Sequence, residues 1–286
     1  MGSRQSNNHK QRSDFRERAP FLYIISVTIL SVILIFANEW FNLGIPFTVH
    51  FLIGFVGSLL VFVVWHAFLT KGWRRSLLIF GLSFLIAFGA EALGVNFGLI
   101  FGRYYYTDFL GPGLFGVPFL AALAWEPVLY AAYHLADLIL SKSTQKPLLA
   151  WLGVGAIGAF STTAWDMMID PIAVHQGWWV WLDGGAYVRE IENGVPVSNF
   201  LGWLGIAFLI MLVYRRGIAG AFPRPHSKWL DSYGPIALYA SLFLTSCGVT
   251  ITILENPGVA LVGLMAMGPI LLIVLFLSYP GVDANL

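Results

Sequence analysis

The sequence predicts an all-α fold: a polytopic membrane helix bundle of about eight transmembrane helices with two long aromatic-rich outer loops. Of the 286 residues, 58% are hydrophobic and only 11% are charged, whereas a soluble domain has roughly 25% charged residues. Apolar runs of roughly 20 residues, the length that crosses a bilayer, recur along the whole chain. As a third observation, nearly all basic residues lie in the N-terminal tail or in every second connection between these runs.

The apolar runs divide the chain into a short tail, a single transmembrane domain and a second short tail. The polar segment 1–20 is followed by an apolar run that has no small-residue cleavage site before Asn38. We therefore expect a cytoplasmic tail and a retained first helix and not a signal peptide. The transmembrane domain is expected over 21–279 and the C-terminal tail over 280–286. The predicted spans are 21–37, 47–69, 77–95, 117–140, 148–169, 200–214, 235–254 and 259–279.

The charge pattern orients the predicted bundle. Of 16 Lys and Arg residues, all but Arg103 and Arg189 lie in the N-terminal tail or in the connections on its side of the membrane. Basic residues favour the cytoplasmic side, so both termini are expected in the cytoplasm and the protein in the plasma membrane. The net charge of +1 argues against nucleic-acid binding. Cys247 is the only cysteine, so a disulfide within the chain is impossible.

Two long loops are expected on the outer side, over 96–116 and 170–199. Both are rich in glycine and aromatic residues. So much aromatic surface is unfavourable as solvated coil, and loops of this length usually have a function if they are ordered. We therefore expect them to fold back as a cap over the outer helix ends.

The fifth run leads into a tryptophan-rich loop and carries two acids. Asp166 and Asp170 are four residues apart, so they share one helix face, and Pro171 is expected to end the helix just after them. Trp165 and the tryptophans at 178, 179 and 181 suit the lipid headgroup level. This pattern fits a polar site at the membrane boundary, or an interfacial anchor with solvated aspartates.

Carboxylic acids from three predicted spans lie at similar depth. Glu91 and Asp166 are each roughly 6 Å inside the outer boundary at 1.5 Å per residue, and Glu126 is roughly 13 Å inside it. A charged side chain in the bilayer costs on the order of 3 kcal/mol. Three unpaired charges in one band are therefore unfavourable, and at least one acid is expected to be protonated.

Glu126 is followed by Pro127, which removes a helical hydrogen bond and bends the helix beside the acid. The bend would open space for a ligand or water. The alternative is a packing kink in which Glu126 bonds to a neighbouring helix. Tyr130 and His134 follow on the same face.

A metal site formed by His66, His134 and Asp137 is conceivable. No spacing motif supports it. A structural hydrogen-bonded cluster is the favoured interpretation, and no metal ligand is assigned.

Several stretches in the centre of the chain together resemble the CruF family of carotenoid hydratases. They are 91–98 (EALGVNFG), 101–108 (FGRYYYTD), 110–112 (LGP), 124–127 (AWEP), 163–166 (TAWD), 170–171 (DP), 177–181 (GWWVW), 194–196 (GVP) and 199–203 (NFLGW). The combination is far more specific than any one of these stretches.

The resemblance implies an integral membrane enzyme of carotenoid biosynthesis. It would add water to the terminal 1',2' double bond of an acyclic end group, in a γ-carotene-like or bacterioruberin-precursor-like carotenoid, and produce a tertiary alcohol. The expected partners are a carotenoid within the bilayer, membrane lipid and other carotenoid biosynthesis enzymes. No cofactor is expected, because acid catalysis suffices for this reaction.

Such a hydration needs an acid, a stabilised tertiary cation and a water molecule. We predict Glu126 as proton donor and Asp166 as the base that orients the water, although the sequence leaves these two roles interchangeable. Glu91 is predicted to support them together with Arg103, and aromatic faces would stabilise the cation. The other predicted substrate contacts are Tyr104, Tyr105, Tyr106, Trp125, Tyr130, Trp165, Asp170 and His175.

Two other functions fit the same residues. A membrane enzyme similar to lycopene cyclases would begin with the same protonation but capture the cation with an internal double bond. A carrier or proton-coupled transporter would also contain intramembrane acids. The clustering of polar residues toward one membrane face, and not at the midplane, argues against a transporter.

Overall fold

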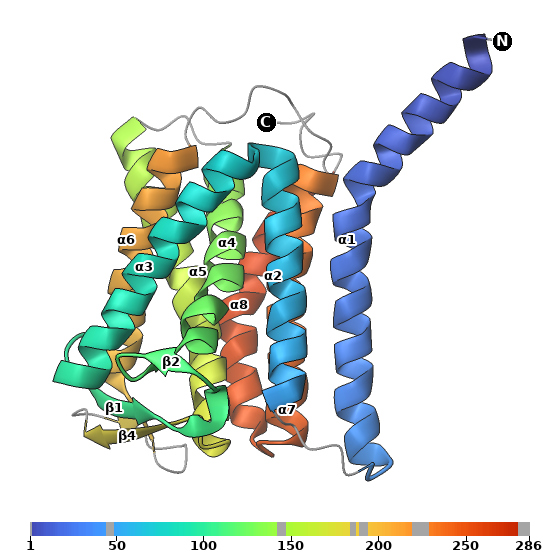
Figure 1. Cartoon of the computed structure of the whole chain (residues 1–286). Coiled ribbons are helices and arrows are strands. Elements are labelled where there is room, and N and C mark those ends of the chain that lie inside the picture. The colour runs from blue at the N-terminus through green and yellow to red at the C-terminus, as the bar shows by residue number, and fades with distance from the viewer. Residues whose placement is uncertain are drawn as a thin grey trace.

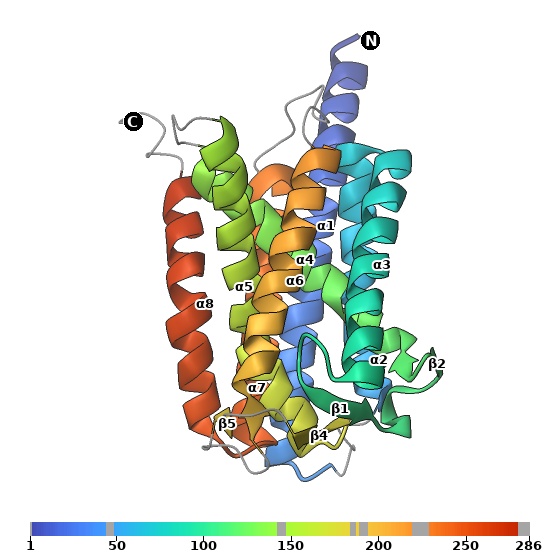
Figure 2. The same ribbon diagram turned by 90° about the vertical axis from the view of Figure 1, so that its left-hand side faces the viewer.

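The computed structural model describes residues 2–43, 49–141, 147–183, 187–188, 194–218 and 229–279. Eight α-helices form a bundle with short strands at one end (Figure 1, Figure 2). This architecture confirms the predicted all-α bundle. The helices are α1 (Gly2–Trp40), α2 (Val49–Lys71), α3 (Trp73–Phe97), α4 (Phe119–Leu140), α5 (Pro147–His175), α6 (Val197–Ile218), α7 (Gly234–Thr252) and α8 (Pro257–Ser278).

Seven of these helices, counted over the described residues, are long and apolar enough to cross a membrane. The exception is α4, which contacts α2, α3, α5, α6, α7 and α8 and contains Glu126, Pro127 and Asp137. Its neighbours shield it from lipid, so it can carry polar groups that an outer helix could not. The central helix is thus the one whose sequence is least typical of a lipid-facing span.

Two helix ends differ from those expected. α1 begins at Gly2 and continues through Pro20, so the first helix includes the polar tail. α6 is longer than the predicted span 200–214. Its last turn carries Arg215 and Arg216, whose positive charges interact favourably with the helix C-terminus.

The prediction that Pro171 ends the fifth helix is wrong. α5 continues through Pro171 to His175. Pro171 removes one helical hydrogen bond, but the helix continues for one more turn, which is closed by a 2.8 Å bond from Trp178 N to Ala173 O. The added turn connects α5 directly to strand β4 (Trp179–Asp183).

The two long loops fold together into a cap, as predicted. Strand β1 (Arg103–Tyr106) of the first loop pairs antiparallel with β4 (Trp179–Asp183) of the second, and the pair lies across one end of the bundle (Figure 1). The Thr107 hydroxyl donates to Gly177 O at 2.7 Å and strengthens this junction. Residues 184–186 and 189–193 of the second loop lie outside the described part, as does the predicted outer Arg189.

Two smaller strand pairs and two short helical turns complete the described structure. β2 (Gly113–Leu114) pairs with β3 (Val117–Pro118), and β5 (Tyr187–Val188) pairs with β6 (Val195–Pro196). A 3-10 turn η1 (Asp108–Leu110) follows β1, and a π turn η2 (Trp229–Tyr233) precedes α7. Together with β1 and β4, β2 and β3 cover the end of the bundle at which α3 ends and α4 begins.

Close packing of α5 on α6 depends on small residues. A Cβ atom at Gly158 would lie 2.7 Å from Met211 Sδ, and one at Gly155 would lie 2.7 Å from Phe208 Cε2. Glycines at such positions let membrane helices approach one another closely. This contact fixes the position of α6, which contributes Asn199 and Trp203 to the site described next.

Candidate active site

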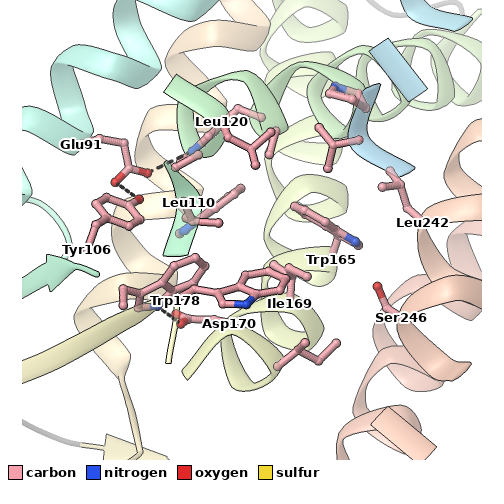
Figure 3. Close-up of a pocket in the computed structure, with 18 of the residues that line it drawn as sticks. Glu91, Tyr106, Leu110, Leu120, Trp165, Ile169, Asp170, Trp178, Leu242 and Ser246 are labelled. Atoms are coloured by element: carbon pink, nitrogen blue, oxygen red, sulfur yellow. Dashed lines mark hydrogen bonds between the residues drawn. The ribbon is translucent and has the colours of Figure 1, made fainter. Parts of the chain in front are cut away.

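A cavity with a volume of about 100 Å³ lies beneath the cap at one end of the bundle. Its walls come from α2 to α7 together with β1, η1 and residues 178–181, which follow α5. Most of the lining is aliphatic or aromatic, but two carboxylic acids, Glu91 and Asp170, also face it (Figure 3). A largely apolar cavity with a few convergent polar groups is the usual form of a small-molecule site.

Glu91 is held in the cavity wall by three hydrogen-bond donors. Tyr104 Oη and Tyr106 Oη both donate to Glu91 Oε2, the latter at 2.8 Å, and Trp125 Nε1 donates to Oε1 at 3.0 Å. The Glu91 side chain is only 4% exposed. An ionised carboxylate can only accept hydrogen bonds, so these three donors complement the charged form of Glu91.

The two tyrosines reach Glu91 because they alternate along strand β1 with Tyr105. Residues two apart in a strand point to the same side, and Tyr105 lies on the other side, where it is 45% exposed. Burial, and secondly the adjacent Glu91, raises the pKa of Tyr104 and Tyr106 well above its usual value. Both phenols therefore stay protonated and remain donors at physiological pH.

Asp170 belongs to a second acid group, in which it is bridged to Asp166. Asn199 Nδ2 donates to Asp170 Oδ2 at 2.5 Å and to Asp166 Oδ2 at 2.9 Å. Asp170 Oδ1 accepts from Trp179 Nε1 at 2.7 Å and from Trp181 Nε1 at 3.4 Å. Two buried carboxyl groups on one amide would repel each other if both were ionised, which favours a single shared proton.

Stacked indole rings form another wall of the cavity. The rings of Trp125 and Trp203 are nearly parallel at 3.6 Å, and Trp165 meets Trp203 edge-on at 6.3 Å. All three rings line the cavity. Indole faces attract positive charge, so this wall can stabilise a cation formed close to it.

The wall opposite the cap strands comes largely from α5 and α7. Thr245 and Ser246 of α7 line the cavity beside aliphatic residues, and Figure 3 shows Leu242 and Ser246 facing the side of Trp165. Trp165 Nε1, Trp178 Nε1 and Thr245 Oγ1 are buried without a hydrogen-bond partner among the described residues. The cavity thus has hydrogen-bonding capacity that the described protein groups do not use.

Seven of the twelve predicted site residues come together here. Of these, Glu91, Tyr104, Tyr106, Trp125, Trp165 and Asp170 line the cavity, and Asp166 joins them through Asn199. Arg103, Tyr105 and His175 are exposed at the capped end and are not in the lining.

The remaining two predicted residues, Glu126 and Tyr130, face other parts of the bundle. Glu126 Oε1 lies 2.6 Å from Ser83 Oγ, and Tyr214 Oη donates to its Oε2 at 3.0 Å. Tyr130 Oη lies 2.7 Å from His66 Nδ1. Pro127, next to Glu126, does line the cavity.

The conceivable metal ligands are engaged with other groups. His66 bonds to Tyr130, and Asp137 pairs with Arg215. No group of three His, Cys, Asp or Glu side chains arranged to hold a metal ion occurs in the described parts of the chain.

Most of the residues that line the cavity were not in the predicted set, and three of them matter for its chemistry. Asn199 bridges the two aspartates, and Trp203 completes the indole wall. Both lie within the stretch 199–203 that carries the family resemblance, so a signal existed for them. Thr245 is one of several hydroxyl residues in the apolar run of α7. Only the packing of α7 shows that its side chain reaches the cavity.

The comparisons with known proteins agree with this location. A family model described as "Carotenoid biosynthesis protein" matches residues 47–270, a range that contains every residue of the cavity. Comparisons with curated proteins and with solved structures gave no match. The family match extends over more than half of the chain, from α2 into α8, and the chain therefore belongs to the carotenoid biosynthesis protein family.

Proposed function

We propose that this membrane protein is a carotenoid hydratase, which adds water to the terminal double bond of an acyclic carotenoid end group. One observation carries the proposal: two buried carboxylic acids, Glu91 and Asp170, face a single apolar cavity walled by indole rings. An apolar end group fits such walls, and the reaction needs both an acid and a base.

In this proposal, Asp170 delivers the proton. Asp170 faces the cavity, and its bridge to Asp166 through Asn199 favours one shared proton. The alkene π electrons form a C–H bond at the less substituted carbon, and the Asp170 O–H bond breaks. A tertiary cation remains, and the faces of Trp125 and Trp203 stabilise it.

Glu91 completes the reaction as the base. Its three donors hold a carboxylate in the cavity wall, where its charge stabilises the cation. Water forms the C–O bond through a lone pair, and its excess proton passes to Glu91. The next cycle requires this proton to return to the aspartate pair. The sequence-based assignment of Glu126 as donor and Asp166 as base stays a prediction. The cavity lining favours Asp170 as donor and Glu91 as base, because both face the cavity.

Pigment analysis tests the reaction. We expect the wild-type protein, expressed in a host that accumulates acyclic carotenoids, to yield a pigment heavier by the mass of water. In deuterated medium, the label should enter the carbon next to the new alcohol. Asp170→Asn should reduce the alcohol by roughly 10²-fold or more, as expected for a lost general acid. Asp108→Asn, at an exposed position of the same cap, is the matched control.

The outcome also separates the hydratase from the cyclase alternative. Cyclisation would give a product with the mass of its substrate and a ring at the reacting end. A wild-type protein that forms neither the alcohol nor a labelled pigment would contradict the proposal of acid-catalysed carotenoid chemistry.

We further propose that the capped end faces away from the cytoplasm. In the sequence, 14 of the 16 basic residues belong to the N-terminal tail or to every second connection between the predicted spans, and basic residues favour the cytoplasmic side. In Figure 1, the start of α1, the turn between α2 and α3 and the end of α6 lie opposite the cap. A topology reporter fused after Gly113 should be found outside, and a cytoplasmic reporter would reverse the assignment.

A further inference from the structure

Unused hydrogen-bonding atoms in the cavity wall are the starting observation. Trp165 Nε1 and Thr245 Oγ1 have no partner among the described residues, although Trp165 is 7% exposed and Thr245 is 4% exposed. Buried polar side-chain atoms are nearly always hydrogen-bonded in native proteins. Two polar atoms without hydrogen-bond partners in the lining of one cavity therefore indicate a polar ligand.

Thr245 is unusual among the helical threonines of this chain. The hydroxyls of Thr162, Thr163 and Thr252 each donate to the carbonyl four residues earlier, at 2.8 to 2.9 Å. This local bond is the common way for a threonine to satisfy itself within a helix. No such bond is present at Thr245, so its hydroxyl can serve a ligand in the cavity.

Trp165 and Thr245 offer complementary groups from two helices. The indole N–H only donates, whereas the threonine hydroxyl both donates and accepts. Figure 3 shows the Trp165 nitrogen on the side of its ring toward α7, the helix that carries Thr245. One hydroxyl oxygen can accept from Trp165 and donate its own hydrogen to Thr245.

The third buried atom of the cavity without a hydrogen-bond partner among the described residues, Trp178 Nε1, belongs to a different part of the wall. Trp178 adjoins the cap strand β4 and stacks on Phe109 at 5.8 Å. Trp165 lies about 7 Å deeper along α5 than Asp170, at 1.5 Å per residue. The pair formed by Trp165 and Thr245 therefore lies apart from the surroundings of Trp178.

We infer that Trp165 and Thr245 form a subsite for one hydroxyl oxygen, that of the water which captures the cation and then of the alcohol it becomes. This inference rests on the proposed hydration. The water forms the C–O bond with a lone pair and loses a proton to the Glu91 carboxylate. The same oxygen remains in the subsite as the product hydroxyl, so no second polar site is required.

The partition of the cation provides the test. Thr245→Val keeps the shape of the side chain and removes its hydroxyl, and Trp165→Phe removes the N–H donor. Without a placed water, the cation should lose a proton and return to alkene. In deuterated medium, we expect alcohol formation to fall at least tenfold in both variants, while deuterium accumulates in recovered substrate. Thr245→Ser should restore the wild-type partition.

Ser241→Ala is the matched control for the loss of a buried hydroxyl. Ser241 Oγ also lacks a partner among the described residues and lies on the same helix, but Ser241 does not line the cavity. This variant should keep the wild-type ratio of alcohol to labelled alkene. If Thr245→Val and Trp165→Phe, expressed at wild-type level, also keep that ratio, the inference is overturned.

Two further outcomes are distinguishable. If the wild-type protein forms neither alcohol nor labelled alkene, the proposed function fails before the subsite is tested. If Thr245→Val keeps the ratio but binds the alcohol product more weakly than wild type, with hydrocarbon binding unchanged, the inference about the attacking water is overturned and only a contact with the product hydroxyl remains. If wild type and Thr245→Val bind the alcohol equally well, the contact with the product hydroxyl is excluded as well.

Discussion

Glu91 and Glu126 are two buried glutamates in one bundle, and their surroundings differ in one decisive respect. Each is only 4% exposed, and each accepts a hydrogen bond from a tyrosine. Glu91 lines the cavity, whereas Glu126 does not. Burial and an acidic side chain are therefore shared features, and access to the cavity distinguishes a candidate catalytic group from a structural one.

The bonds around Glu126 form a closed network. Ser83 Oγ lies 3.0 Å from Ile79 O and 2.6 Å from Glu126 Oε1, but a hydroxyl has only one hydrogen to donate. If Ser83 donates to Ile79, it can accept the proton of a neutral Glu126. Tyr214 then donates to the other oxygen, so the neutral acid is satisfied without any ligand.

The largest expected difference comes from changing each glutamate to glutamine. Glu91→Gln removes the proposed base and should reduce kcat/KM for alcohol formation by roughly 10²-fold. Glu126→Gln should leave the rate nearly unchanged, because its network does not reach the cavity lining. Product formation per unit of purified protein, measured on both variants, gives the comparison.

The opposite result would restore the sequence-based assignment. A well-folded Glu126→Gln protein without activity, beside an active Glu91→Gln protein, would identify Glu126 as the proton donor. It would also show that the cavity lining is a poor guide to the reacting groups.

A smaller difference is expected from the tyrosines that contact these acids. Tyr104→Phe removes a donor to Glu91 and should lower kcat/KM about tenfold, since a hydrogen bond to a charged group contributes about 1.5 to 3 kcal/mol. Tyr214→Phe should instead lower the free energy of unfolding by about 1 kcal/mol with little effect on kcat/KM. Kinetics and thermal unfolding of both variants separate these effects, and equal kinetic losses would count against the distinction.

The smallest expected effect concerns the junction of the cap. Thr107→Val removes the bond to Gly177 O, and a loss of about threefold in kcat/KM is expected, equivalent to a neutral hydrogen bond of about 0.5 to 1.5 kcal/mol. Thr70→Val removes the Thr70 hydroxyl bond to His66 O at the other end of the bundle and is the control. If Thr70→Val reduces activity as much, the effect reflects general stability and not the cap.

Much of the fold could be predicted because membrane crossing imposes simple requirements on a sequence. Apolar length identified the helices, and aromatic composition identified the cap. The end of α5 was mispredicted because Pro171 was assigned the effect it has in a helix centre. Pro171 cannot donate to the carbonyl of Met167, but the turn after it is still hydrogen-bonded, because Gln176 N donates to Ile172 O and Trp178 N donates to Ala173 O.

The site was only partly predictable, because depth along a helix does not determine which way a side chain points. Glu91 and Glu126 were both expected at the outer side, but α4 turns Glu126 toward Ser83 and Tyr214. Asp166 and Asp170 were expected on one face, and their shared bond to Asn199 agrees with it. The role of Thr245 depends on how α7 packs, which no local pattern specifies.

The pairing of β1 with β4 has a consequence for how the protein assembles during synthesis. These strands are separated along the chain by α4 and α5, so their pairing closes a long loop and must wait until both helices have been made. Tyr104 and Tyr106 lie on β1, and Trp179 and Trp181 lie on β4. A nascent chain that ends after α4 therefore lacks half of the strand pair, although all three donors to Glu91 are already present. Asp166 and Asp170 of α5 gain their complete set of donors only after β4 and the start of α6 have been made.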